Sequence, residues 1–354
     1  MNKEQNSSEI FTCVRYPVGC PDGKIQLPHL VEKGMDIAAW EFRRAEIRRR
    51  LHAVMGLAPP VTILRWRVLD QTIQENVLCK RIAYSSCDGE TATGYLLTGT
   101  CLREQRRPAI LALHPTDLEC ADSLVARRGE CEEDYPYALE LARRGFVVFA
   151  PDLFMRWHYP NAAATEQLYD TEVLSQKHPL WSAMGRAVYD HQQALRLLCS
   201  LDGVDAARIG VIGHSLGGTN AMLLAALDNR IKAVVLSCCV CSFCGHPYPD
   251  IWCREKGFCY FPSLRNTLKE GVVPFEWMEV LACIAPRPLH IFAAQKDVWF
   301  PRWDGALESV RRAEEVYRIY HQSEALDFVL WDGPHSFPSF ARKEAFSFLE
   351  NNLL

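Results

Sequence analysis

Hydrophobic positions after residue 108 fall into short continuous apolar runs that alternate with longer segments of helical periodicity. Buried parallel strands joined by crossover helices produce this alternation, because both faces of such strands are covered. The sequence therefore predicts an α/β fold with a mostly parallel, doubly wound sheet. The expected strands are residues 109–113, 146–150, 209–212, 231–236, 289–293 and 326–330, and the expected helices are residues 136–144, 180–200, 216–227, 304–321 and 339–353.

The chain before this alternation has a different pattern. A charged helical stretch at residues 35–55 is ended by Gly56 and the pair Pro59 and Pro60, since proline cannot continue a helix. We expect residues 1–60 to form an N-terminal helical appendage and residues 61–354 to form the main domain. Apolar runs at residues 61–68, 77–84 and 91–97 predict antiparallel strands at the N-terminal start of the sheet, and residues 245–274 are a candidate lid insertion.

Composition and charge narrow the function classes. Hydrophobic residues make up 49% of the 354 positions, as in an ordinary globular protein with a sizeable core. The 39 basic and 43 acidic residues give a net charge of −4, so we expect no nucleic-acid partner. No apolar run approaches the roughly 18 residues that span a bilayer, and the polar N-terminus lacks a signal sequence. We therefore expect a cytoplasmic protein without membrane attachment; its oligomeric state is left open.

Fifteen cysteines are a high number, but thiols stay reduced in the cytoplasm and a disulfide framework is not expected. The two-residue gap between Cys241 and Cys244 is typical of a zinc site, and Cys253, Cys259 or His246 could complete a ligand set. The second pair is not at a zinc-ribbon spacing, and Cys238 and Cys239 continue an expected strand. We favour buried cysteines and no metal, although the alternative of a metal at residues 238–259 stays open.

A nucleophile motif lies where the expected strand at residues 209–212 runs into a helix. Residues 213–217 read Gly-His-Ser-Leu-Gly, which fits the Gly-x-Ser-x-Gly elbow that lifts a serine hydroxyl above the sheet edge. The following helix directs its positive end at the same place, where negative charge develops on an attacked carbonyl. The pattern predicts Ser215 as a catalytic nucleophile.

A serine nucleophile needs a base, and in this kind of fold the chain order is serine, acid, histidine. His290 lies inside a strand, and His321 ends an amphipathic helix as a surface residue would. His335 lies in a turn-rich loop directly after the final strand, from which it can reach over the sheet edge. We therefore predict His335 as the base.

Three aspartates compete for the role of the acid. Asp297 follows the strand at residues 289–293 by a short turn, which places it at a strand's carboxyl end. Asp304 is expected to cap the next helix. Asp332 shares a turn with the base, where a short aspartate more often bonds local backbone. We predict Asp297 as the acid, with Asp332 as its rival.

Acyl transfer also requires two hydrogen-bond donors for the oxyanion. One is expected to be the backbone N–H of Leu216, directly after the nucleophile. The other should come from the loop after the strand at residues 109–113, where Pro115 has no N–H and Thr116 is the natural donor. His114 precedes the serine in the chain and is expected to be a structural histidine.

With these residues assembled, the chain resembles the α/β-hydrolase superfamily, in the branch of dienelactone-hydrolase-like and acetyl-xylan-esterase-like proteins and prolyl oligopeptidase catalytic domains. The resemblance begins near residue 108 and rests on the motifs at residues 113–116, 148–152, 204–210, 213–218, 285–288 and 333–338. It implies Ser215, Asp297 and His335 as the triad and Leu216 with Thr116 as oxyanion donors. Dienelactone hydrolases use cysteine as nucleophile, so the serine here favours an esterase.

The leading hypothesis is a serine carboxylic ester hydrolase that acts on small ester substrates through an acyl-enzyme and needs no cofactor. The segment before the core is too short for the β-propeller that gates prolyl oligopeptidases, so peptides are less expected. A peptidase or amidase acting on short substrates, and a non-catalytic small-molecule binding protein, remain the alternatives. The aromatic residues expected to line a substrate pocket are Trp157, Trp252, Tyr260, Trp299 and Phe300.

Overall fold

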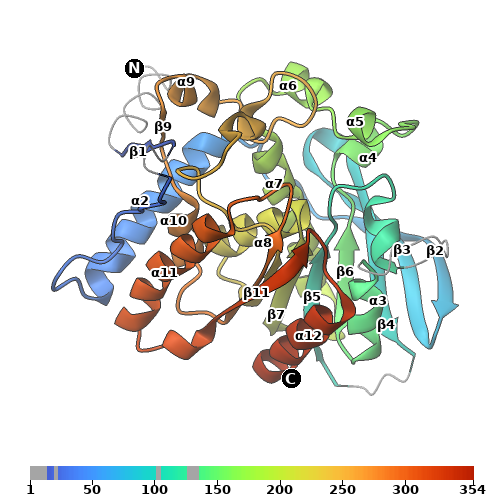
Figure 1. Ribbon diagram of the computed structural model, residues 1–354. Helices are drawn as coiled ribbons and strands as arrows, with labels where there is room; N and C mark the ends of the chain where they lie inside the picture. Colours follow the sequence, from blue (N-terminus) through green and yellow to red (C-terminus); the bar gives the residue numbers. More distant parts are fainter. Residues whose placement is uncertain (1–13, 20–22, 101–104, 126–134) are drawn as a thin grey trace. The chain divides into compact units, whose positions relative to one another are not determined.

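The computed structural model describes residues 14–19, 23–100, 105–125 and 135–354 (Figure 1). The polar N-terminal start therefore lies outside the described residues. The chain forms two compact units, and each is built from three separated stretches of sequence. The first unit comprises Met1–Ala58, Asp170–Arg186 and Val240–His335, and the second comprises Pro59–Tyr169, Ala187–Cys239 and Ser336–Leu354.

The second unit is built on seven strands in the order β8-β7-β5-β6-β4-β3-β2. Strands β8, β7, β5 and β6 are parallel, and β4, β3 and β2 continue the sheet in antiparallel fashion. This is the mostly parallel sheet with antiparallel N-terminal strands that the sequence predicts. The strand bounds are β2 Trp66–Gln74, β3 Val77–Ser85, β4 Thr91–Gly99, β5 Arg107–Leu113, β6 Val147–Pro151, β7 Val204–His214 and β8 Ile231–Ser237.

The central strands consist of apolar residues that are buried on both faces. Ile110, Phe149, Val211 and Val235 come from four neighbouring strands, and each is fully buried. β-Branched and aromatic side chains suit such strands, because they pack well on a pleated surface that is covered on both sides. The continuous apolar runs seen in the sequence are therefore the core of this unit.

Helices pack against this sheet. The N-terminal turn of α8 faces the ends of β5 and β7, while α3 and α12 are joined by an ion pair between Glu140 and Arg342 at 2.8 Å. Helix α7 begins in the first unit and continues into the second. The helix bounds are η1 Cys87–Gly89, η2 Cys120–Val125, α3 Tyr137–Arg143, α4 Met155–His158, α5 Thr165–Leu168, α7 Ala183–Ser200, α8 Leu216–Leu227 and α12 Ser339–Leu353.

The first unit holds two parallel strands, β10 and β11, and a small antiparallel pair, β1 and β9. Helix α11 packs on both parallel strands and on α10. The candidate lid at residues 245–274 includes η3, α9 and β9, and its role as a lid stays a prediction. The bounds are β1 Tyr16–Pro17, α2 Ile37–Met55, α6 Glu172–Lys177, η3 Pro249–Cys253, α9 Leu264–Lys269, β9 Val272–Val273, α10 Trp277–Ala282, β10 Leu289–Lys296, α11 Trp303–Ile319, η4 Ser323–Ala325 and β11 Leu326–Pro334.

Helix α2 is fixed to α10 of the same unit by a buried ion pair. The Arg50 guanidinium donates to both carboxylate oxygens of Glu279, at 3.0 and 2.7 Å, and to the backbone oxygen of Pro274 at 2.6 Å. Trp40 and Ile47 on the same helix are fully buried. The N-terminal helix therefore belongs to the core of its unit. The predicted division into residues 1–60 and 61–354 stays a prediction.

Three local expectations are corrected by the structure. The strand expected at residues 61–68 starts only at Trp66, because the preceding residues form an extended coil whose Thr62 oxygen accepts from Arg196 at 3.0 Å. Strand β8 ends at Ser237, and Cys238 leaves it with a positive φ of 47°. Asp304 does not cap α11: it lies in the first helical turn and pairs with the capping residue Arg302 at 2.7 Å.

Candidate active site

The turn between β7 and α8 holds Ser215 in a strained backbone conformation. Its φ is 54° and its ψ is −121°, a backbone conformation that residues other than glycine rarely adopt. A Cβ atom on Gly213 would lie 2.2 Å from the Gly217 oxygen, and one on Gly217 would lie 2.0 Å from the Leu113 oxygen. Both glycines are therefore required by close backbone contacts. The turn has the geometry of a nucleophile elbow.

The backbone groups around Ser215 leave a donor available beside it. The backbone N–H of Ser215 donates to the backbone oxygen of Ser237 at 2.9 Å. The backbone oxygen of Ser215 accepts from the N–H of Thr219 at 3.0 Å. Leu216 is the first residue of α8, where N–H groups have no intrahelical partner. Among the described residues, no acceptor receives the Leu216 N–H. This N–H can serve an incoming oxyanion.

The loop after β5 ends at the same edge of the sheet as the elbow. Leu113 is paired with Gly213 in the parallel register, so the residues that follow each strand are neighbours. Thr116 is exposed, and its N–H has no acceptor in the part of the chain that the structure describes. The structure thus places Thr116, Leu216 and Ser215 at one end of the second unit's sheet.

Asp297 and His335 form a hydrogen-bonded pair in the first unit. Asp297 Oδ2 lies 2.6 Å from His335 Nδ1, and Oδ1 accepts from the backbone N–H groups of Trp299 and Phe300, each at 2.8 Å. The Asp297 side chain is 2% exposed. Because a carboxylate only accepts, Nδ1 carries the proton of this bond and Nε2 is left as the acceptor. That is the tautomer a general base requires.

The rival acid is engaged elsewhere. Asp332 pairs with Lys296 Nζ at 2.9 Å, and both side chains are about two-thirds exposed. Among the other histidines considered, His290 is buried and bonds Asp327 at 2.7 Å, while His321 is exposed. Asp297 is therefore the aspartate that contacts the predicted base.

Three of the five predicted pocket aromatics, Tyr260, Trp252 and Phe300, form a row of neighbouring rings that ends at His335. In the first unit the Phe300 ring stacks on His335, with ring centroids 5.9 Å apart, and the ring centroids of Trp252 and Phe300 are 6.4 Å apart. Tyr260 meets Trp252 at 4.8 Å. Trp252 is fully buried, so it supports this row as a core side chain and has no surface to offer a ligand.

The other two predicted aromatics lie apart from this row. Trp299 is 62% exposed. Trp157 belongs to the second unit, where its indole N–H donates to Glu90 Oε2 at 3.2 Å. The sequence could place these residues near strand ends, but it could not distinguish an exposed ring from a buried one.

The cysteines after β8 behave as buried thiols. Cys244 Sγ lies 3.6 Å from the Gly19 oxygen, and Cys259 Sγ accepts from Arg265 at 3.4 Å. Burial raises the pKa of Cys259 to about 11 and also raises the pKa of Cys253. The cysteines are buried, as expected, and the absence of a metal from residues 238–259 stays a prediction.

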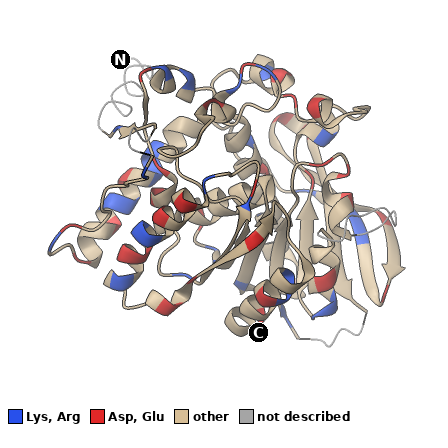
Figure 2. Ribbon diagram, viewed as in Figure 1, with Lys and Arg blue, Asp and Glu red and all other residues tan. Residues whose placement is uncertain are grey.

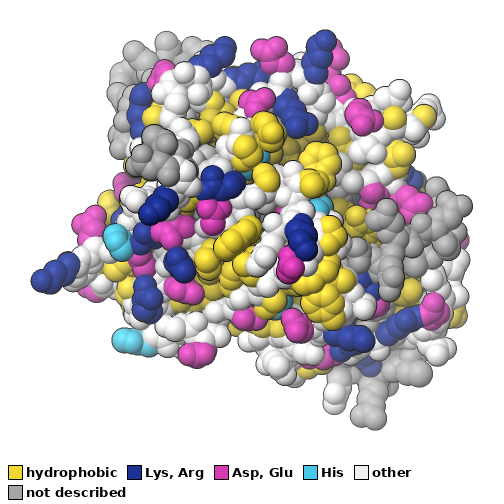
Figure 3. All heavy atoms as spheres, in the orientation of Figure 1, with side chains coloured by type: hydrophobic (Ala, Val, Ile, Leu, Met, Phe, Trp, Pro, Cys, Tyr) yellow, Lys and Arg dark blue, Asp and Glu magenta, His cyan; other side chains and the backbone are white. Residues whose placement is uncertain are grey.

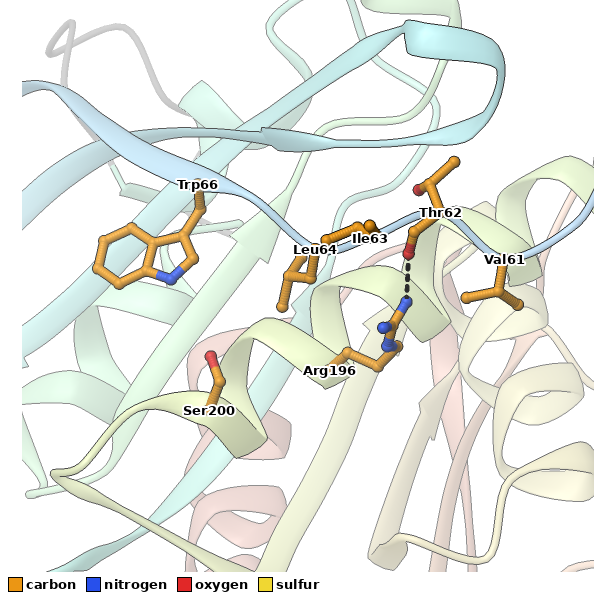
Figure 4. A pocket seen from close by; sticks show the side chains of 7 residues that line it. All are labelled: Val61, Thr62, Ile63, Leu64, Trp66, Arg196 and Ser200. Atoms are coloured by element: carbon orange, nitrogen blue, oxygen red, sulfur yellow. Dashed lines mark hydrogen bonds between the residues drawn. The ribbon is translucent and has the colours of Figure 1, made fainter.

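A groove of about 660 Å³ lies between the coil before β2 and helix α7 (Figure 4). Arg196 crosses it to donate to Thr62 O, and the remaining lining is mostly apolar. None of the predicted catalytic or oxyanion residues lines it. Its lining residues are Val61, Thr62, Ile63, Leu64, Trp66, Arg196 and Ser200.

Surface charges are mixed in sign. Figure 2 shows basic and acidic residues interspersed along α11, and Figure 3 shows the same mixture on the face that it draws. Within the described ranges, no helix combines the length and apolar character needed to cross a bilayer.

Comparisons with known proteins agree with this architecture. Residues 134–238 match the dienelactone hydrolase family. A provisionally named hydrolase of Bacillus subtilis (strain 168), YtaP, is 26% identical over 319 residues, which covers 87% of this chain and 99% of that protein. A solved glucuronoyl esterase from Solibacter usitatus has a TM-score of 0.68 at 16% identity and covers 95% of this chain and 98% of its own.

A second solved structure, a carbohydrate esterase family 15 glucuronoyl esterase from Caldicellulosiruptor kristjansonii, has a TM-score of 0.62 at 16% identity. The match covers 90% of this chain and 87% of the other. These likenesses confirm the predicted α/β-hydrolase fold. The family match includes the elbow at Ser215 and indicates a hydrolase.

Proposed function

We propose that this member of the α/β-hydrolase superfamily is a serine carboxylic ester hydrolase that acts on small ester substrates through an acyl-enzyme. The observation that carries the proposal is the 2.6 Å bond between Asp297 and His335, which keeps the proton on Nδ1 and gives Nε2 the lone pair of a base. The strained elbow at Ser215 supplies the matching nucleophile. Asp297, His335 and Ser215 have the residue types and chain order of a catalytic triad.

In the proposed reaction, Ser215 Oγ attacks the ester carbonyl while His335 Nε2 takes its proton. The resulting oxyanion accepts hydrogen bonds from the N–H groups of Leu216 and Thr116. His335 then protonates the departing alcohol, and the acyl group remains on Ser215. A water molecule, deprotonated by the same imidazole, attacks the acyl carbon, and the imidazolium returns this proton to Ser215 Oγ as the acid leaves. Asp297 holds the ring in the required tautomer throughout.

The ester class follows from the relatives by analogy. The two solved structures described above are named as glucuronoyl esterases, so esters attached to sugars belong in the first substrate panel. Phe300, stacked on His335, offers an aromatic face on which a sugar ring or an acyl chain can rest. The proposal requires no cofactor.

The cysteines support a proposed cytoplasmic location. Eleven cysteines in the described part of the chain form no disulfide, and several of them are fully buried, such as Cys87 and Cys283. Free thiols persist in reducing compartments, whereas secreted proteins commonly pair them.

A fluorophosphonate probe tests the proposal directly. Native protein should be labelled at Ser215, and Ser215→Ala should abolish both labelling and ester hydrolysis. Comparing ester and amide turnover for one acyl group separates the esterase from an amidase. Absence of labelling together with absence of turnover across the ester panel would favour a non-catalytic binding protein.

A further inference from the structure

The peptide group between Pro115 and Thr116 is held by its carbonyl. His114 Nδ1 lies 2.7 Å from the Pro115 oxygen, and the Tyr169 hydroxyl lies 3.2 Å from the same oxygen. Both side chains are buried, His114 at 1% and Tyr169 at 3% exposure. Two buried donors on one loop carbonyl restrict its orientation strongly.

The hydrogen bonds of His114 define its tautomer. The backbone N–H of Leu153 donates to His114 Nε2 at 3.3 Å, so this nitrogen is an acceptor. Nδ1 therefore carries the proton and donates it to the Pro115 oxygen. This arrangement uses both ring nitrogens, which explains why His114 is unavailable as a base.

Tyr169 reaches the loop from 52 to 54 residues later in the chain. Its hydroxyl proton is shared between the oxygens of Pro115 and Asp117, each at 3.2 Å, and its oxygen accepts from the Asp117 N–H at 3.3 Å. The residues on both sides of Thr116 are thus bound to one buried hydroxyl. Thr116 itself is exposed and donates its N–H to no described residue.

Planarity links these contacts to the proposed oxyanion donor. The Pro115–Thr116 peptide is trans, so its C=O and N–H point in opposite directions within one plane. Whatever fixes the Pro115 oxygen therefore also fixes the direction of the Thr116 N–H. Hydrogen bonds to a carbonyl also polarise its amide, which makes the N–H a stronger donor.

We propose that His114 and Tyr169 are positioning residues that orient the Thr116 N–H toward the oxyanion by holding the carbonyl of the same peptide group. This inference rests on the proposed esterase function. It assigns to His114 and Tyr169 the orientation of the Thr116 N–H, which neither the elbow nor the acid–base pair provides. His114 and Tyr169 do not touch the substrate; they act through the Pro115–Thr116 peptide.

The test compares Tyr169→Phe with a matched control, Tyr317→Phe. Tyr317 is also fully buried, and its hydroxyl donates to a single backbone oxygen, that of Arg287, at 2.7 Å. Tyr169→Phe should lower kcat for a small ester by about tenfold with little change in KM, because loss of a whole oxyanion donor typically costs 10²–10³ in kcat. Tyr317→Phe should leave kcat unchanged.

A pair of substitutions at His114 probes the same peptide independently. Asparagine places a donor near the position of Nδ1, whereas glutamine places its polar group near Nε2. His114→Asn should therefore keep more activity than His114→Gln, for which a loss of about 10²-fold in kcat is expected. Circular dichroism confirms folding, and Tyr169→Phe decides the matter if either histidine variant does not fold.

A transition-state analogue supplies a readout that mere loss of stability would not change. The affinity of a trifluoromethyl ketone, whose hemiketal oxygen occupies the oxyanion position, should fall by the same factor as kcat/KM in Tyr169→Phe. If Tyr169→Phe and His114→Gln both keep the kcat and the analogue affinity of the wild type, the inference is wrong, and the proposed esterase function still stands. Absence of wild-type Ser215 labelling and turnover would overturn the proposed function and this inference together.

Discussion

At the scale of single residues, the two aspartates near the base have different surroundings. Asp297 is buried and uses one oxygen for His335 and the other for two backbone N–H groups. Asp332 is exposed beside Lys296. The first oxygen of Asp297 acts on the imidazole, and the second fixes the carboxylate plane. A substitution can therefore change the tautomer of the base without changing the fold.

We expect Asp297→Asn to lower kcat by about 10⁴-fold at neutral pH, because an amide presents the wrong partner to His335 Nδ1. Asp332→Asn should stay within about tenfold of wild type, since asparagine supports similar turns. Ester kinetics on both variants check this, with circular dichroism to confirm folding. A crippled Asp332→Asn beside an active Asp297→Asn would show that the acid is assigned wrongly.

The buried carboxyl group of Glu276 makes the free energy of unfolding depend on pH. Its carboxylate is fully buried before α10 and accepts from the N–H groups of Trp277 and Phe243, at 2.8 and 2.9 Å. Burial outweighs these hydrogen bonds and raises the pKa of Glu276 to about 7. Since the folded pKa is above the unfolded one, this group stabilises the fold at low pH, and that stability is lost as pH rises through about 7.

Glu276→Gln removes this titration. Relative to the variant, wild type should lose up to about 3 kcal/mol of unfolding free energy between pH 4 and pH 8. Urea unfolding of both proteins at several pH values measures the difference, and Glu270→Gln at an exposed position is the control. A wild-type-to-variant difference that stays constant across this range would contradict the assignment.

The sequence predicts which residues form the candidate site, but it does not predict the distant residues that contact them. Ser215 and His335 were predictable because glycine spacing and chain order constrain them locally. The contribution of Tyr169 was not predictable, since its contacts join residues more than fifty positions apart. Nothing in the local pattern around Tyr169 distinguishes it from an ordinary core tyrosine.

At the scale of elements, the buried strands were the easiest to predict. Their continuous apolar runs correspond to β5, β7, β8 and β10 with shifts only at the ends. The expected strand at residues 61–68 forms only from Trp66 onward, and Val61 and Ile63 in the preceding coil are exposed. In that coil, the hydrogen bond between Arg196 and Thr62 replaces strand pairing.

The contact between α2 and α10 gives a prediction at this scale. Arg50→Met leaves Glu279 buried without its partner, which should cost about 3–5 kcal/mol of unfolding free energy. Arg50→Met combined with Glu279→Leu should be less destabilised than Arg50→Met alone, because no charge is then left buried. Chemical unfolding of the two proteins gives the comparison.

The exposed pair of Arg15 and Glu270 is the control for this experiment. Arg15→Met should cost less than about 1 kcal/mol, as is usual for surface ion pairs. If the double variant at α2 and α10 is destabilised by the sum of its two single changes, the ion pair is not the principal contact between these helices.

At the scale of the whole molecule, each unit combines distant stretches of chain. The first unit takes Met1–Ala58 together with Val240–His335. Removal of the N-terminal stretch therefore deletes core side chains, among them Trp40, Ile47 and Leu51. The prediction that residues 1–60 form an appendage can be tested by removing them.

We expect a chain that starts at Pro59 to lose the folded first unit and all esterase activity. Near-ultraviolet circular dichroism and fluorophosphonate labelling of the truncated chain test this. A truncated protein that is folded and labelled at Ser215 would instead show that residues 61–354 form an independent catalytic domain, as the sequence alone suggested.

The position of α2 also matters while the protein is being made. Arg50 leaves the ribosome 229 residues before its partner Glu279. At roughly 5–20 residues per second, the delay is about 10–45 seconds. During this time the apolar face of α2 has no native partner, and most of the stability of a helix in a protein comes from such tertiary packing. A nascent-chain chaperone that binds the emerging helix would protect it until translation has passed α10.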